Sequence, residues 1–147
     1  HGTLNYWKSS FLQELSDDAI DTMIACYRAA PSPRVAINLE HLGGEMWRVD
    51  PSATAFEERS AAFNLIITGC WTDPAETDST IRWIRETWKA LQPFAKNSVY
   101  INYVDAGDEA RTESAYGGNY ARLASLKSKY DPGNLFRHNH NIAPKSD

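Results

Sequence analysis

The sequence lacks a long apolar run and an excess of positive charge, and both absences exclude classes of protein. No stretch approaches the ~20 consecutive apolar residues that a membrane-spanning helix needs. The net charge of −4 and the pI near 5.5 give no general attraction to nucleic acids or to anionic membranes. We therefore expect neither a nucleic acid nor a membrane among the partners of this protein.

Cysteine is almost absent as well. The two cysteines, Cys26 and Cys70, have no disulfide or metal-binding spacing, and each lies in an apolar stretch. We therefore predict two buried free thiols. His138 and His140 would share a face in an extended segment, but they lack a clear third ligand, so we predict no metal site.

What is present suffices for a folded domain. The chain has 147 residues, of which 42% are hydrophobic and 23% are charged, so it can bury one substantial core and is not a disordered chain. The first residues have neither the basic nor the apolar region of a signal peptide. The compartment stays unassigned, with the cytoplasm slightly favoured.

Apolar periodicity and capping residues predict the order of elements. Spacings of three and four residues indicate helices, and alternation indicates strands. The predicted helices are 17–30, one that begins at Asp73-Pro74 and ends at Pro93, and 119–130. The predicted strands are 4–12 (strand or extended lead-in), 34–41, 46–49, 62–71 and 99–104, with Gly43-Gly44 joining the second and third as a hairpin. This order predicts an α+β fold with an antiparallel sheet, helices on one face, and a final helix and tail outside that layer.

Two residues of the predicted strands, Tyr103 and Glu40, are candidates for a site. In a strand, alternate side chains share a face, so Tyr103 would lie on one face of 99–104, and Tyr100 and Asn102 on the other. Tyr103 could act as a general base only if its pKa fell below the usual ~10 or if proton loss came late. From the spacing alone, a tyrosine in a strand more often packs against its neighbours with its hydroxyl satisfied. Glu40 on the polar face of 34–41 fits either a substrate contact or a solvated strand face.

Several motifs occur in a fixed order along the chain. Four lie in the last third: Tyr100-Ile-Asn-Tyr-Val-Asp105, Tyr116-Gly-Gly-Asn-Tyr-Ala-Arg-Leu123, Lys127-Ser-Lys-Tyr-Asp-Pro-Gly-Asn-Leu-Phe-Arg137 and Asn139-His-Asn-Ile142. Others lie upstream: Tyr6-Trp-Lys-Ser9, Leu42-Gly-Gly44, Thr54-Ala-Phe56 followed by Arg59, and Trp71 ahead of a helix. In this order and spacing the motifs resemble the C-terminal part of the berberine bridge enzyme-like flavoproteins, which are FAD-linked oxidases and dehydrogenases related to vanillyl-alcohol oxidase.

The resemblance implies a function and a domain organisation. Residues 1–104 would be part of a substrate domain and 105–147 the C-terminal berberine bridge-like segment, with the FAD-binding domain outside this sequence. The full-length protein would oxidise a small organic substrate by hydride transfer to FAD, with O2 as a possible acceptor. FAD would be bound mainly by the N-terminal domain, which is also the expected partner, and this chain alone would be inactive.

The resemblance also suggests roles for single residues. Tyr103 matches the family tyrosine that acts as a base, and Asn102 and Asn139 match positions that contact the flavin. Ile66 falls where some members have a polar or acidic residue in the substrate cavity, so here it would form an apolar wall. Tyr116, Asn119 and Arg122 are weaker candidates. The alternative is a non-catalytic binding domain that keeps the fold without flavin.

Overall fold

The computed structural model describes residues 2–104, 111–138 and 140–145. By its internal contacts the chain divides into two compact units. The first unit combines residues 1–42 with 61–97, and the second combines 43–60 with 98–147. This division by contacts differs from the division into 1–104 and 105–147 suggested by the family resemblance, which stays a prediction about function.

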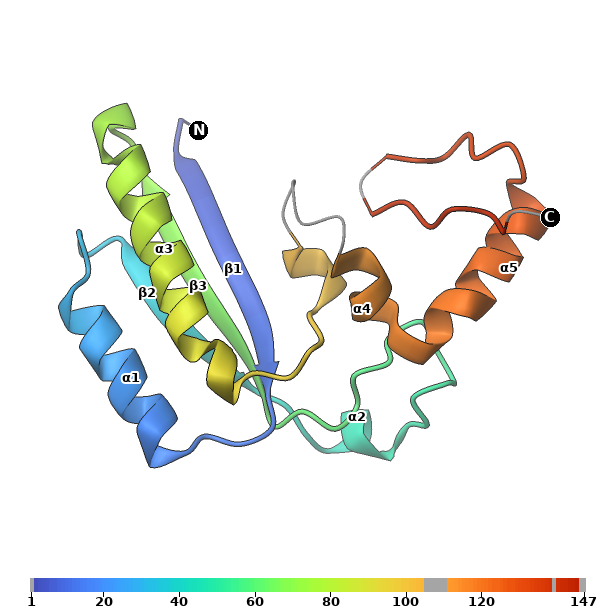
Figure 1. The fold of residues 1–147 in the computed structure, drawn as a ribbon, viewed down its shortest axis with the longest axis horizontal. Helices are drawn as coiled ribbons and strands as arrows, with labels where there is room; N and C mark the ends of the chain where they lie inside the picture. Colours follow the sequence, from blue (N-terminus) through green and yellow to red (C-terminus); the bar gives the residue numbers. More distant parts are fainter. Residues whose placement is uncertain (1, 105–110, 139, 146–147) are drawn as a thin grey trace. The chain divides into compact units, whose positions relative to one another are not determined.

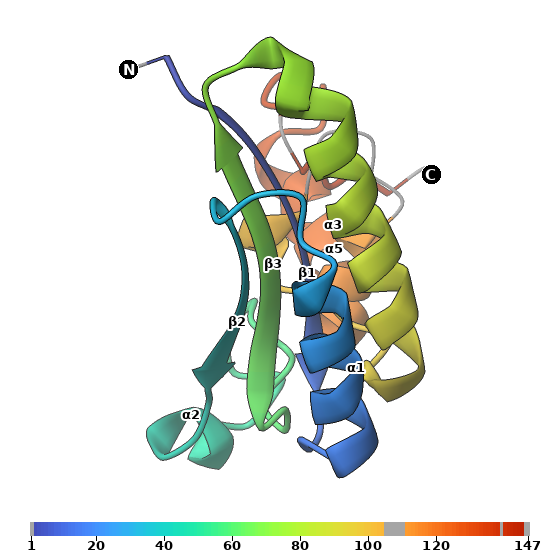
Figure 2. The same ribbon diagram turned by 90° about the vertical axis from the view of Figure 1, so that its left-hand side faces the viewer.

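The first unit is an antiparallel sheet with two helices on one face. Strands β1 (Leu4–Leu12), β3 (Phe63–Trp71) and β2 (Val35–His41) are hydrogen-bonded in the order β1-β3-β2. Helices α1 (Asp17–Arg28) and α3 (Thr77–Leu91) lie on the same side of this sheet (Figure 2). The α+β class and the one-sided helix layer are thus confirmed.

The core of this unit forms where the apolar sheet face meets the two helices. Leu65 and Ile67 of β3 are fully buried there, as is Ile84 of α3. Trp88 of α3 packs against this cluster, and its ring N–H donates to the Ser10 hydroxyl at 3.0 Å. Burial of large apolar side chains is worth about 1.5–3 kcal/mol each, so this layer dominates the stability of the unit.

Local sequence signals explain where these helices begin. The Ser16 side chain accepts a hydrogen bond from the Ala19 N–H and caps α1, as its sequence suggests. The Asp73 side chain caps a short 3₁₀ turn, Pro74–Glu76, directly before α3. Both features confirm the sequence-based boundaries to within a few residues.

The second unit contains only helices, turns and loops among its described residues (Figure 1). Its elements are α2 (Glu45–Arg48), a 3₁₀ turn at Ile101–Tyr103, α4 (Thr112–Tyr116), a 3₁₀ turn at Gly117–Asn119 and α5 (Tyr120–Tyr130). Helix α5 confirms the helix predicted at 119–130.

Two predicted features are wrong in this region. Gly43-Gly44 does not form a hairpin, because Gly44 has a φ of 62° and leads into the helical turn α2, while β2 pairs with β3. Residues 99–104 are not a strand: Val99 and Val104 are buried, but the chain folds into a 3₁₀ turn. No neighbouring strand supplies hydrogen bonds there within the described residues.

The cysteines are both free, as predicted, but not both buried. Cys26 is half-buried and Cys70 is exposed. Cys70 alternates with Gly69 and Trp71 along β3, so its side chain points away from the helix layer.

Candidate functional site

The sheet face opposite the helices carries the two predicted substrate residues. On β3 this face presents Asn64 and Ile66, which are 2% and 7% exposed. Glu40 of β2 is paired with Asn64 across the ladder, so Glu40 and Ile66 are diagonal neighbours on this face. The structure therefore brings the two predicted residues together.

A side-chain hydrogen bond orders the polar part of this face. The Asn64 amide nitrogen donates to the Glu40 carboxylate at 2.7 Å. The other amide atom of Asn64, the buried oxygen Oδ1, has no hydrogen-bond partner within the described residues. Because a buried acceptor without a partner costs free energy, this oxygen is suited to accept a hydrogen bond from a bound hydroxyl or N–H group. Asn64 was not singled out by the sequence analysis.

The second unit holds Tyr103 and Asn102 in one tight turn. The Tyr103 N–H donates to the Tyr100 carbonyl at 2.9 Å, and the Val104 N–H donates to the Ile101 carbonyl at 3.2 Å. With three residues per turn, side chains three positions apart lie on the same side. Tyr100 and Tyr103 therefore share a side, whereas the predicted strand would have placed them on opposite faces.

Aromatic contacts surround this turn. The rings of Tyr100 and Tyr103 meet edge-to-face, with centroids 5.4 Å apart and an interplanar angle of 79°. Phe56 contacts Tyr100 in the same way, at 5.8 Å and 86°. The Asn102 amide nitrogen donates to the Tyr100 hydroxyl at 2.9 Å. The turn thus gathers a phenol, an amide and a second phenol.

The closing tail contributes another amide. Asn139 lies outside the described residues, so its predicted flavin contact stays a prediction. Its near neighbour Asn141 is described, and its side-chain oxygen is buried without a hydrogen-bond partner in that part of the chain. The sequence analysis quoted Asn141 as part of a motif and gave it no role; its unmatched acceptor now makes it a candidate ligand group.

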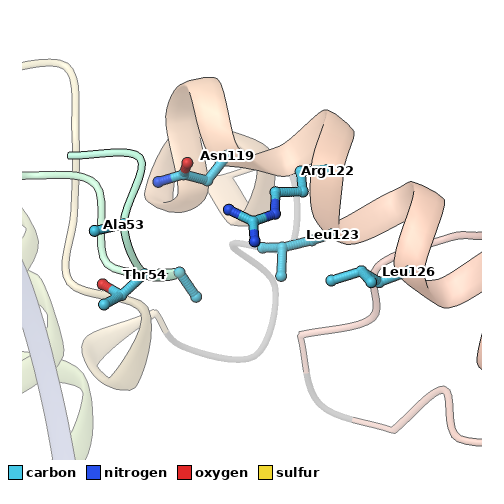
Figure 3. Close-up of a pocket in the computed structure, with 7 residues that line it drawn as sticks. Ala53, Thr54, Asn119, Arg122, Leu123 and Leu126 are labelled. Atoms are coloured by element: carbon cyan, nitrogen blue, oxygen red, sulfur yellow. The ribbon is translucent and has the colours of Figure 1, made fainter. Parts of the chain in front are cut away.

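The weaker candidates have structural partners. Asn119 donates to the Pro51 carbonyl at 2.7 Å, and Arg122 donates to the Ser52 carbonyl at 3.2 Å. Both side chains therefore connect the N-terminal part of α5 to the loop before Thr54. With Thr54, they border a mainly apolar hollow of about 130 Å³, completed by Ala53, Ala55, Leu123 and Leu126 (Figure 3). Burial raises the pKa of Tyr116 above its usual value, so its hydroxyl stays protonated and is unsuited to act as a base.

Neither a metal centre nor a membrane segment emerges from the described residues. They contain no group of three or more histidine, cysteine, aspartate or glutamate side chains arranged to hold an ion. No helix among them has the length and apolar character that crossing a bilayer requires.

Sequence comparison identifies similar proteins over nearly the whole chain. The family model described as "Berberine and berberine like" matches residues 99–143. The chain is 33% identical to an uncharacterized FAD-linked oxidoreductase of Bacillus subtilis (strain 168) over 136 residues, which are 92% of this chain and 30% of that protein. It is 31% identical to the aclacinomycin-N/aclacinomycin-A oxidase of Streptomyces galilaeus over 128 residues, covering 74% of this chain and 23% of the oxidase.

Solved structures show the same fold. A glycopeptide hexose oxidase crystallised with teicoplanin superposes with a TM-score of 0.83 and 26% identity, over 97% of this chain and 33% of the oxidase. Berberine bridge enzyme from Eschscholzia californica superposes with a TM-score of 0.89 and 20% identity, over 99% of this chain and 34% of the enzyme. The chain spans about a third of the length of each of these two enzymes.

Proposed function

Since the chain belongs to the berberine bridge enzyme-like FAD-linked oxidoreductases and spans about a third of their length, we propose that it supplies the substrate-facing part of such an enzyme. The full-length protein oxidises a small organic molecule. One observation carries this proposal: the matched segment 99–143 contains Tyr103 and Asn102 within a single ordered turn.

The residues present are compatible with a flavin. The edge of the isoalloxazine ring carries carbonyl oxygens and an N–H group, and an amide side chain can pair with either kind. Asn102 is exposed, and Asn141 has a buried oxygen without a partner among the described residues. These two amides, together with Asn139, are the groups of this chain that we assign to the flavin.

FAD, when bound, accepts a hydride from the substrate, which is the redox step that the side chains cannot perform. The chain's own contribution is to hold the substrate and to take a proton. For an alcohol substrate, the hydrogen on carbon leaves with its electron pair and the hydroxyl hydrogen leaves as a proton. We assign the proton to the Tyr103 oxygen, which takes it in the phenolate form and becomes a neutral phenol, with O2 as the final acceptor of the electrons in an oxidase.

Glu40 and Ile66 define the substrate side of this proposal. The carboxylate of Glu40, ordered by Asn64, offers hydrogen-bond acceptors, while the side chain of Ile66 offers an apolar surface. Because Ile66 cannot exchange a proton, Tyr103 is the base without a second acid or base at that position. A substrate with a hydroxyl group beside an apolar segment fits this pair.

The proposal is tested by replacing Tyr103 with phenylalanine in the full-length protein. A positioned general base contributes about 10²- to 10⁴-fold, so we expect anaerobic flavin reduction by substrate to slow by at least about 100-fold while FAD stays bound. Rapid-mixing absorbance at the flavin band measures this rate. An unchanged rate would remove Tyr103 from the base role, and a full-length protein that binds no flavin would favour a non-catalytic binding domain.

A further inference from the structure

We propose that Tyr100 is a positioning residue for the reaction, holding the base Tyr103 with its ring and the amide Asn102 with its hydroxyl. This inference rests on the proposed function, because it takes the roles of Tyr103 and Asn102 from there. Sequence alternation had placed Tyr100 on the face away from Tyr103, so its link to the base becomes visible only in the folded turn.

The backbone carbonyl and the ring of Tyr100 position Tyr103. Tyr100 precedes the turn, and its carbonyl accepts the hydrogen bond that fixes the Tyr103 backbone. The same three-residue spacing places the two rings in edge-to-face contact at 5.4 Å. Such a contact is worth about 0.5–1.5 kcal/mol beyond burial and restricts the orientation of the Tyr103 ring. The position of the reactive oxygen therefore depends on the ring of Tyr100.

The hydroxyl of Tyr100 positions Asn102. It accepts a hydrogen bond from the Asn102 amide nitrogen at 2.9 Å, although Asn102 itself is exposed. An exposed amide without such a partner would sample several rotamers. Because the nitrogen is held by Tyr100, the carbonyl oxygen of Asn102 keeps a defined direction. One tyrosine thus orients both the proton acceptor and the amide that we assign to the flavin.

Tyr100 also contacts a second aromatic ring, that of Phe56. Phe56 packs edge-to-face on the Tyr100 ring, and the Arg59 guanidinium lies 4.8 Å from the centre of the Phe56 ring. Arg59 also donates to the Phe56 carbonyl at 3.1 Å and to the Thr54 hydroxyl at 2.6 Å. This series of contacts links the Thr54-Ala-Phe56 and Arg59 motif to the aromatic ring that Tyr103 contacts.

Two substitutions in the full-length holoenzyme separate the effect of the Tyr100 ring on Tyr103 from the effect of the Tyr100 hydroxyl on Asn102. Tyr100→Leu removes the ring, and because misplacement of a reacting group by about 1 Å can cost about 100-fold, we expect flavin reduction to slow by about 10- to 100-fold and its pH midpoint to shift. The dissociation constant of the substrate and the FAD content should stay as in the wild type. Tyr100→Phe keeps the ring, so we expect a smaller loss of rate, with a displaced flavin absorption maximum because Asn102 is released.

A double-variant cycle decides whether Tyr100 acts through Tyr103. If it does, then in the Tyr103→Phe background Tyr100→Leu slows flavin reduction no more than Tyr100→Phe does, because the base that the ring positions is already lost and only the release of Asn102 remains. Losses that multiply would overturn the proposal. Tyr130→Leu is the matched control, since Tyr130 is 73% exposed at the end of α5 and should leave rate, pH midpoint and spectrum unchanged.

The outcome for Tyr100 is distinguishable from that of the proposed function. If Tyr103→Phe alone has no effect, the base assignment fails, and a normal flavin spectrum in Tyr100→Phe then overturns the positioning role as well. If Tyr100→Leu does not fold, the rate and spectrum of Tyr100→Phe decide the question. A wild-type rate and spectrum in that variant would contradict the proposal.

Discussion

At the scale of single residues, the polar group on the sheet face opposite the helices joins Asn64 to a partner that is distant in the sequence. Alternation and motif resemblance indicate Tyr103, Glu40 and Ile66, and the structure places Glu40 and Ile66 as diagonal neighbours on one sheet face. Asn64 escaped notice because an amide in an apolar strand has no distinctive spacing. Its importance comes from a hydrogen bond to a residue 24 positions away, which only the strand register creates.

Asp131 offers a test at this scale. Its carboxylate accepts hydrogen bonds from the Leu135 and Phe136 N–H groups at 2.8 and 3.0 Å and pairs with Lys127. The hydrogen bond from Lys127, with smaller contributions from the two backbone N–H groups, lowers the pKa of Asp131 below its usual 3.8. The ionised carboxylate therefore stabilises the turn 131–136 fully above about pH 3.8, the usual pKa. This stabilisation is lost as the pH falls through the lower pKa of the folded state.

We therefore expect the Leu135 and Phe136 amides to lose protection in Asp131→Ala, and in the wild type only at strongly acidic pH. Amide hydrogen exchange, corrected for the intrinsic pH dependence, measures both effects. Asp21→Ala, an exposed substitution in α1, should leave these two amides unchanged. Equal exchange in wild type and Asp131→Ala at neutral pH would contradict the expected role of the carboxylate.

At the scale of elements, local signals predicted helices and the buried strand well. Capping by Ser16 and Asp73 and the apolar stripe of α3 are properties of short segments, so they can be recognised in sequence. The two errors share a physical origin. Tyr, Ile and Val favour strands only where a neighbouring strand supplies hydrogen bonds, and Gly43-Gly44 favours a turn without determining whether a strand or a helix comes after it. After Gly44 the chain forms a helical turn in which Arg48 pairs with Glu45 at 2.9 Å.

The contact of α3 with β3 provides a test of element packing. A side chain added at Gly69 would place its Cβ 2.6 Å from the Thr80 methyl group and 3.0 Å from a methyl group of Ile84. Overpacking of this kind costs about 1–3 kcal/mol, so we expect Gly69→Ala to lower the free energy of unfolding by that amount. Denaturant titration followed by tryptophan fluorescence measures the change.

Thr80→Ser supplies the control, because it deletes the obstructing methyl group and keeps the hydroxyl. We expect Gly69→Ala combined with Thr80→Ser to recover most of the loss relative to Gly69→Ala alone. If Gly69→Ala lowers the free energy of unfolding equally with and without Thr80→Ser in α3, a clash with the Thr80 methyl group is not the cause of the loss. Gly133→Ala, where an added Cβ meets nothing within 4 Å, should have little effect.

At the scale of the whole molecule, the family resemblance predicted more than physical pattern could. Composition led us to expect neither nucleic acid nor membranes as general partners, but neither charge nor periodicity indicated a flavin. The α+β fold followed from element order, whereas the two-unit organisation did not, because residues 43–60 join the last third of the chain rather than the strands on either side of them. Such a long-range association leaves no local signal.

The chain by itself should not hold the cofactor. We expect the 147-residue protein, mixed with excess FAD and then passed through a desalting column, to elute without absorbance near ~450 nm, because most of the FAD contacts are assigned to residues outside it. The full-length protein treated in the same way should remain yellow. Stoichiometric FAD on the 147-residue chain would contradict this division of roles.

The hydrogen bond from the Leu42 N–H to the Ala62 carbonyl, at 2.8 Å, has a consequence for the order of folding. It lies where β2 ends and β3 begins, so the segment 43–60 leaves and rejoins the first unit at one place. Pairing of β2 with β3 therefore closes the loop 43–60, and this pairing must offset the conformational entropy that the loop loses on closure. We therefore expect the sheet to form first and the second unit to condense afterwards on a loop whose ends are already fixed, so that a shift in the register of β2 would delay both.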